Sequence, residues 1–137
     1  MSEFITAECS IDSREDLIAA LEEIFPREQI EVHDEPQPLF GYQNDRREQT
    51  AEVIIRRKNV GGSSNDMGFR WNEAKKAYDA IISAYDRQQG WEGKVKQAYA
   101  MQKVKAVVKA AKRQMKVISG KIAPGAGRQK IVIEVSV

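Results

Sequence analysis

Residues 67–85 read MGFRWNEAKKAYDAIISAY, and the predicted fold is built outward from this stretch. Its first half alternates, with Met67, Phe69 and Trp71 on one side of an extended chain. The polar segment 73–76 separates that half from a second β-rich run over 77–85. Two extended runs joined by a short polar segment are typical of a β-hairpin. We therefore expect two antiparallel neighbouring strands here.

Further strands are expected on the N-terminal side of this hairpin. Alternating apolar residues predict strands over 4–11 and 51–56. A short strand before Pro36 and Pro38 is expected at a sheet edge or outside the sheet, because proline cannot donate to a strand ladder. The polar stretch 43–50 is expected to be a loop.

Two helices are predicted between the strands. The first follows Asp12 or Ser13, either of which supplies an N-cap oxygen, and it ends at Pro26. The second covers 91–115, where the apolar period changes to 3.6 residues and marks a stripe that we expect to face the core. We expect Leu21 in the first helix and Val108 in the second to be core residues. The stripe consists of Ala100, Met101, Val104, Val107, Val108, Ala111 and Met115.

The C-terminal residues predict a last hairpin, with strands over 117–122 and 131–137 around a glycine-rich turn. Residues 1–137 then form a single α+β domain in the order β-α-β-β-β-β-α-β-β. The expected architecture is one antiparallel sheet with both helices packed on one face, a ferredoxin-like variant.

The composition is that of an ordinary globular domain, with 42% hydrophobic and 31% charged residues. Residues 1–50 carry 13 acidic and 4 basic side chains, whereas residues 91–137 carry 2 and 11. The N-terminus lacks the pattern of an export signal, no apolar run is long enough to span a membrane, and Cys9 is the only cysteine. We expect a cytoplasmic protein without a membrane partner.

No catalytic constellation is recognisable in the sequence. His33 is the only histidine, and it stands among acidic residues and prolines without a nucleophile nearby. Cys9 and His33 would supply at most two zinc ligands. We predict no catalytic residue, no cofactor and no metal, which favours a protein without enzymatic activity and leaves that question open.

The second helix also carries a basic arc that could attract phosphates with a strong salt dependence. The same pattern suits a solvated helix face that lies against the acidic N-terminal half. The candidate nucleic-acid-binding residues of this arc are Lys94, Lys105, Lys109, Lys112, Arg113 and Lys116.

Several short boxes resemble one small family, the hypothetical chloroplast reading frame thirty-five family, also called domain of unknown function twelve-fifty-seven. The boxes are MSEF at 1–4, GY at 41–42, AEVIIRRK at 51–58, DMGFRWNE at 66–73 and IVIEV at 131–135. The resemblance implies a small protein of plastid, cyanobacterial, other bacterial and phage genomes without an established activity. In bacteria such proteins are often encoded near an AAA+ ATPase. The lysine-rich second helix departs from the plastid pattern.

Two hypotheses of function follow. The first is a non-catalytic adaptor or regulatory protein-binding module, which the resemblance links to an AAA+ ATPase as a partner. Its candidate partner-binding residues come from the boxes: Arg56, Phe69, Arg70, Trp71 and Asn72. The alternative is a nucleic-acid-binding module that uses the basic second helix.

Overall fold

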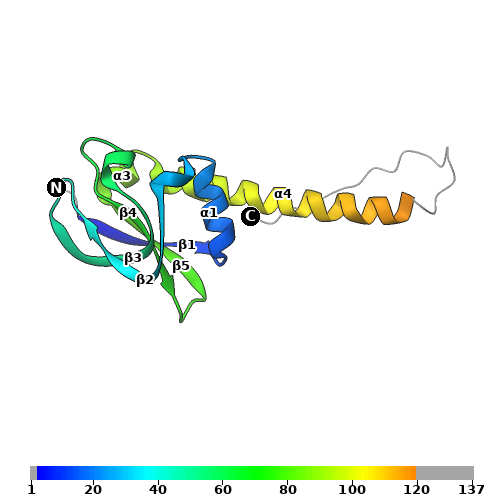
Figure 1. Ribbon diagram of the computed structural model, residues 1–137, viewed down its shortest axis with the longest axis horizontal. Coiled ribbons are helices and arrows are strands. Elements are labelled where there is room, and N and C mark those ends of the chain that lie inside the picture. The colour runs from blue at the N-terminus through cyan, green and yellow to red at the C-terminus, as the bar shows by residue number, and fades with distance from the viewer. Residues whose placement is uncertain (1–2, 120–137) are drawn as a thin grey trace.

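The computed structural model describes residues 3–119, and the chain forms a five-stranded sheet with helices (Figure 1). The strand order is β1-β5-β4-β3-β2, and every neighbouring pair is antiparallel. This confirms the predicted α+β class. The strands are β1 (Phe4–Ile11), β2 (Ile30–Phe40), β3 (Arg46–Ile55), β4 (Met67–Asn72) and β5 (Ala77–Ser83).

The predicted central hairpin is confirmed as β4 and β5. Phe69 pairs with Ala80 and Trp71 pairs with Tyr78, so the alternating residues of both strands share one face. β3 lies on the other side of β4, and β1 completes the sheet beside β5. β1 is therefore an edge strand, although it comes first in the chain.

β2 is the other edge strand, as its two prolines predicted. Its pairing with β3 shifts register between Val32 and Gln37 and again between Pro38 and Phe40. The predicted loop over 43–50 is wrong in its second half, because β3 begins at Arg46. These polar residues lack an apolar alternation, and they become a strand because the end of β2 pairs with them.

The first helix, α1 (Arg14–Glu22), begins where the sequence predicted. Ser13 is its N-cap, and the Ser13 hydroxyl accepts a hydrogen bond from the backbone N–H of Asp16 at 3.2 Å. Leu21 is fully buried, which confirms it as a core residue. Three short elements were not predicted: the 3-10 helix η1 (Arg27–Gln29) and the helices α2 (Arg57–Val60) and α3 (Ala84–Gln88).

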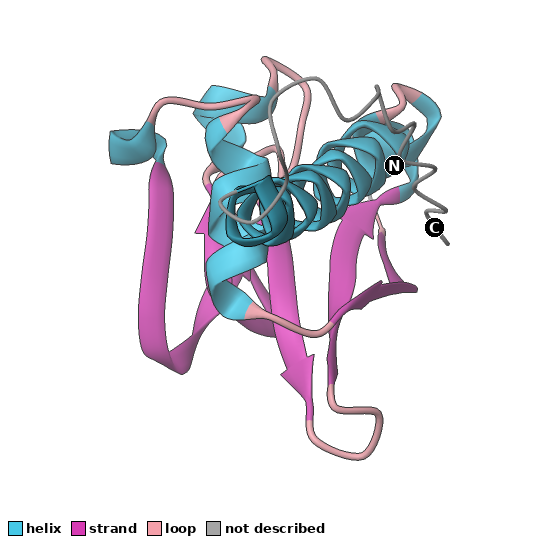
Figure 2. Cartoon of the chain, turned by 90° about the vertical axis from the view of Figure 1, so that its right-hand side faces the viewer, coloured by secondary structure: helices cyan, strands magenta, loops and turns pink. Residues whose placement is uncertain are grey.

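The main core lies between one face of the sheet and the two longer helices, α1 and α4 (Trp91–Ser119). In Figure 2 both helices lie on the same side of the strands, as predicted. The largest side chains of this main core include Ile11, Leu17, Leu21, Ile55, Met67 and Phe69. The opposite face holds a smaller apolar cluster of Leu39, Ala51, Ile54 and Ile81, with Phe4 packed against it.

Only the first half of α4 packs on the domain. Val95 and Tyr99 are buried, and the Trp91 ring stacks on Phe25 with ring centroids 5.3 Å apart. Beyond them α4 projects from the sheet and α1 (Figure 1). The helix continues to Ser119, so the predicted strand over 117–122 is wrong at its start. The rest of the predicted C-terminal hairpin lies outside the described residues.

The predicted core-facing stripe of α4 is wrong in its direction. At about 100° per residue, the positions of the stripe lie on the side of the helix opposite Val95 and Tyr99. Met101, Val107 and Met115 are 49%, 39% and 45% exposed. Val108 is only half-buried and does not belong to the core. The period located an apolar face, but the helix extends beyond the domain that this face was expected to cover.

Candidate functional site

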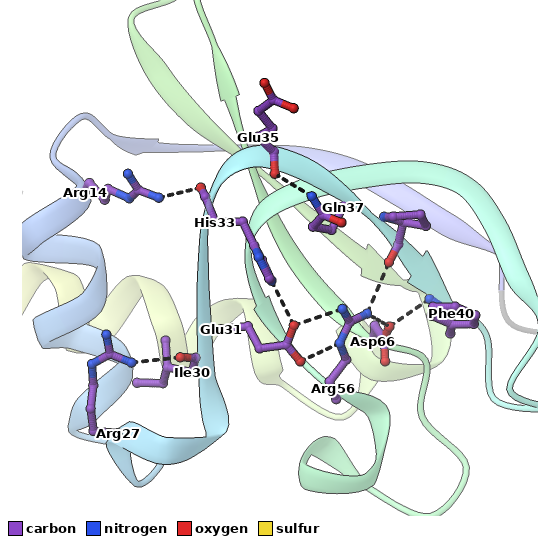
Figure 3. Close-up of polar contacts among 11 residues, drawn as sticks. Arg14, Arg27, Ile30, Glu31, His33, Glu35, Gln37, Phe40, Arg56 and Asp66 are labelled. Atoms are coloured by element: carbon purple, nitrogen blue, oxygen red, sulfur yellow. Dashed lines mark hydrogen bonds and ion pairs between the residues drawn. The ribbon is translucent and has the colours of Figure 1, made fainter.

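Arg56, a candidate from the sequence, lies directly after β3 as the N-cap residue of α2, and it joins two carboxylates (Figure 3). Its Nε and Nη2 groups donate to Glu31 at 2.6 and 2.9 Å, a bidentate pair. Nη1 donates to Asp66 at 2.9 Å and to the Pro38 carbonyl at 3.1 Å. The Arg56 guanidinium thus connects β2, β3 and the loop before β4.

The Arg56 guanidinium and the Glu31 carboxylate each stabilise the ionised form of the other. Hydrogen bonding to Glu31 raises the pKa of Arg56, with Asp66 acting in the same direction. Burial alone would raise the pKa of Glu31, but hydrogen bonds from Arg56 and His33 more than offset it and hold that pKa below its usual value. The His33 Nε2 atom lies 2.9 Å from Glu31 Oε1, so His33 belongs to the network.

Asp66 is the buried centre of the network, with only 1% of its side chain exposed. Besides Arg56, its carboxylate accepts the backbone N–H of Phe40 at 2.8 Å and of Arg57 at 2.7 Å. The backbone N–H of Asp66 also donates to the Phe40 carbonyl at 2.9 Å. Charge-assisted hydrogen bonds to a buried carboxylate fix the backbone strongly. Asp66 therefore fastens the loop before β4 to the end of β2.

A second group of buried polar residues continues from Asp66. The Asn65 side-chain oxygen accepts the Tyr42 N–H at 2.8 Å, and the Asp86 carboxylate accepts the Asn65 N–H at 3.2 Å. Asp86 also accepts the Ser83 hydroxyl at 2.7 Å, while Ser83 caps α3. Neither Asn65 nor Asp86 was expected to be buried. The only signal at Asn65 was the Asn65-Asp66 pair after a glycine-rich turn, which is also typical of exposed loops, and Asp86 had none.

The other members of the 66–73 box act mainly in the core. Phe69 is fully buried, so its side chain presents no surface to a partner. Trp71 is half-buried and packs edge-on against Tyr78 with ring centroids 5.0 Å apart. Gly68 faces Leu39 and Ala51 so closely that a Cβ atom would lie 2.8 Å from each of them. The box thus holds the sheet, the core and the β2 edge together.

A family model described as "Protein of unknown function (DUF1257)" matches residues 26–121, which include this box and the Arg56 network. The chain belongs to this family. The match runs from η1 through α4 and leaves β1 and α1 outside it. No curated protein and no solved structure matches the chain.

Two candidates of this DUF1257 chain, Arg70 and Asn72, lie on the sheet face opposite α1 and α4. Arg70 contacts the Thr50 hydroxyl, and its Nε lies 3.8 Å from Glu52. Asn72 donates to Asp79 at 3.0 Å. Lys75 completes this polar ladder through Glu8 at 2.5 Å and Asp79 at 3.8 Å. Hydrogen bonding to Glu8 raises the pKa of Lys75.

The structure does not bring the five partner-binding candidates into one surface. Arg70 and Asn72 share the ladder, with Trp71 pointing to the other face of β4. Arg56 lies at the far end of β3 and Phe69 lies in the core. The candidates were grouped because they are close in the sequence, but neighbouring residues of a strand point to opposite faces of the sheet.

The basic candidates divide along α4 into paired and unpaired residues. Lys94 lies 4.5 Å from the centre of the Trp91 ring, and Lys105 forms an ion pair with Glu23 at 2.7 Å. Hydrogen bonding to Lys105 lowers the pKa of Glu23. The side chains of Lys109, Lys112 and Arg113 make no ion pair or hydrogen bond with any other described residue. Lys116 lies in the same helix, but its side chain is not described.

A groove of about 440 Å³ lies between β1 and α4. Glu8, Ser10, Lys96, Tyr99 and Lys103 line it together with Cys9. Tyr99 donates to Asp12 at 2.9 Å, and that hydrogen bond lowers the pKa of Asp12. Burial raises the pKa of the Cys9 thiol to about 11, and its S–H donates to the Tyr78 carbonyl at 2.9 Å. Cys9 is thus a protonated, hydrogen-bonded thiol at neutral pH.

Neither a metal site nor a membrane helix is found in the part of the chain that the structure describes. Among residues 3–119, no three His, Cys, Asp or Glu side chains gather as metal ligands would. No helix in this range has the length and apolar character needed to cross a membrane.

Proposed function

We propose that this protein is a non-catalytic adaptor or regulatory module that binds another protein. One observation supports this function above the others: α4 carries an apolar stripe that starts at Ala100 and continues along its projecting half, on the side opposite the buried Val95 and Tyr99. Large exposed apolar side chains that gather on one surface mark an interaction site more often than scattered ones do. Methionines, of which the stripe has two, suit an adaptable protein-binding surface.

The family resemblance adds a candidate partner, an AAA+ ATPase, and the sequence predicts that the two would meet in the cytoplasm. A regulatory module of this kind would use the sheet domain as a rigid base and α4 as the contact arm. Besides the α4 stripe, the polar ladder of Arg70 and Asn72 is a second surface that could contact a partner.

Nucleic-acid binding remains the alternative function, and one observation favours it. Lys109, Lys112 and Arg113 have no anionic partner among the described residues and lie on the projecting half of α4. Unpaired cations along an exposed helix attract phosphates, with an affinity that falls steeply as salt increases.

A pull-down with the tagged full-length chain from host lysate, with and without nuclease, separates the two functions. The stripe variant carries Met101→Ser, Val107→Ser and Met115→Ser, and the basic variant carries Lys109→Glu and Lys112→Glu. If the protein is an adaptor, the stripe variant loses a specific captured protein that the wild type retains after nuclease treatment.

The matched control for the stripe variant is Ala106→Ser with Ala110→Ser, because both positions are exposed and lie on the opposite side of α4. This control is expected to capture the partner normally. Loss of capture in the basic variant alone, and only without nuclease, would instead establish the nucleic-acid function.

A further inference from the structure

We propose that the α4 stripe binds one acidic amphipathic helix of a partner protein as a two-stranded coiled coil. This inference rests on the proposed function and specifies the chemistry of the partner. The interacting surface starts at Met101, beside Glu23 and Ile24, and continues along the projecting half of α4 to Met115.

The spacing of the stripe is the first argument. Met101, Val104, Val108, Ala111 and Met115 follow one another at alternating intervals of three and four residues. This is the a/d pattern of a heptad repeat, which presents a narrow seam to a second helix. The small Ala111 side chain leaves room for a facing side chain. The pattern is shorter than a long coiled coil and suits a local helix-on-helix contact.

The charges beside the seam are the second argument. With Met101 at position a, Lys105 and Lys112 occupy the e positions, which contact the g positions of a partner helix. No acidic residue lies between Lys94 and Lys130. Glutamates at the facing positions would therefore pair with both lysines, whereas a basic helix would be repelled. Lys105 already pairs with Glu23 at 2.7 Å, so a partner glutamate would share this lysine, whereas the Lys112 side chain has no acidic partner among the described residues.

The third argument is that like charges destabilise the projecting half of α4 when no partner is bound. Lys105, Lys109 and Arg113 follow one another at intervals of four residues, so each lies next to a like charge on the helix surface. No described residue of α4 after Tyr99 is buried, and tertiary packing supplies most of the stability of helices in proteins. An acidic partner helix covers the apolar seam and adds a negative charge beside Lys105, which weakens the repulsion at that end of the row, whereas Lys109 at position b and Arg113 at position f stay in solvent.

The other possible occupants fit this surface less well. A second copy of the chain would place the same basic segment against itself without a compensating acid. A membrane-surface helix usually carries Trp, Phe or Leu on its apolar face. The stripe has only Met, Val and Ala.

The test uses the full-length chain and a labelled synthetic four-heptad peptide with Ile at a, Leu at d and Glu at e and g. A second peptide has Lys in place of every Glu, and a third has Ser at a and d. We expect fluorescence anisotropy to show binding of the Glu peptide, weaker binding at high salt, and no binding of the other two.

Two variants of the chain then separate the seam from the charges. Val104→Ser with Val108→Ser keeps similar helix propensity and should weaken binding of the Glu peptide about ten-fold or more. Lys105→Glu with Lys112→Glu should weaken the Glu peptide by a similar factor and allow the Lys peptide to bind. The pair Ala106→Ser and Ala110→Ser should leave binding unchanged.

Several results would overturn the inference: no binding of the Glu peptide, equal binding of both charged peptides, or an unchanged affinity in the seam variant. Dimerisation of the chain through the seam in sedimentation experiments, or seam-dependent binding to anionic vesicles, would also overturn it. If any of these results is obtained while the stripe variant still loses its captured protein in the pull-down, only the coiled-coil inference fails and the proposed function stands. If the stripe variant also captures normally, both fail.

Discussion

Gly68→Ala is expected to destabilise the protein because the sheet leaves no room for one methyl group. A Cβ at this position would lie 2.8 Å from Ala51 Cβ, 2.8 Å from Leu39 Cδ1 and 3.0 Å from Leu39 Cδ2. Ala51 moves only with its backbone, and Leu39 is fully buried. Overpacking of this kind costs about 1–3 kcal/mol. Replacing glycine also reduces unfolded-state entropy, which returns about 0.4–1 kcal/mol.

The net loss in the free energy of unfolding should therefore be about 0.5–2 kcal/mol. Leu39→Ala alone should cost about 2–5 kcal/mol through the cavity that it leaves. In that background the Gly68→Ala cost should fall by about 1 kcal/mol or more, because the two sites share the same space. Urea unfolding of the four proteins, followed by tryptophan fluorescence, measures this coupling.

Gly93→Ala in α4 is the matched control, since no other heavy atom that could clash lies within 4 Å of its Cβ position. It should be neutral or stabilising by up to about 1 kcal/mol. An equal Gly68→Ala effect with and without Leu39 would refute the steric argument. So would a Gly68→Ala protein as stable as the wild type.

Three further predictions follow from the polar groups. Arg56→Ala should lower the free energy of unfolding by about 1–3 kcal/mol, because it removes a donor from buried Asp66, whereas Arg70→Ala should change it by about 0.5 kcal/mol or less in the same urea assay. The folded-state pKa of Glu31 lies below its ordinary value of 4.5, so its contribution to stability is present above that pH and is lost as the pH falls through the lower folded pKa. Urea midpoints measured downward from pH 6 should therefore decline less in Glu31→Gln than in the wild type, and equal declines would contradict this. Folded Cys9 should resist iodoacetamide at pH 8 and react only in urea, as mass spectrometry would show; rapid labelling of the folded chain would contradict its burial and its pKa of about 11.

The elements with a strong local signal were predictable from the sequence. The hairpin of β4 and β5 follows from alternation around a polar turn, and the start of α1 follows from Ser13, although α1 ends at Glu22 and not at Pro26 as predicted. The short helices α2 and α3 have four and five residues, too few to establish a period. The strand residues that begin at Arg46 are polar, so only their pairing partner in β2 shows that they belong to the sheet.

The candidate site was less predictable, because the role of each polar or apolar side chain depends on which other segment packs against it in the fold. Arg56 was identified from its box, but its partners Glu31 and Asp66 come from segments 25 and 10 residues away. Buried Asp66 could not be expected from residue type, since aspartate is rarely buried unless it is paired. In α4 the period revealed an apolar stripe correctly, yet period alone cannot show whether a stripe faces its own domain or a partner.

The 66–73 box serves mainly the fold, whereas the projecting half of α4 does not, and this difference determines how function can be tested in this family. Asp66, Gly68 and Phe69 hold the β2 edge, the sheet packing and the core, so altering them changes folding and any binding together. Among the described residues, Lys105 is the last in α4 that makes a hydrogen bond or ion pair with another element, and the α4 side chains after it make none. Substitutions between 106 and 115 can therefore remove a binding surface without removing a core contact. A loss of partner binding in these variants, at an unchanged free energy of unfolding, would identify recognition itself.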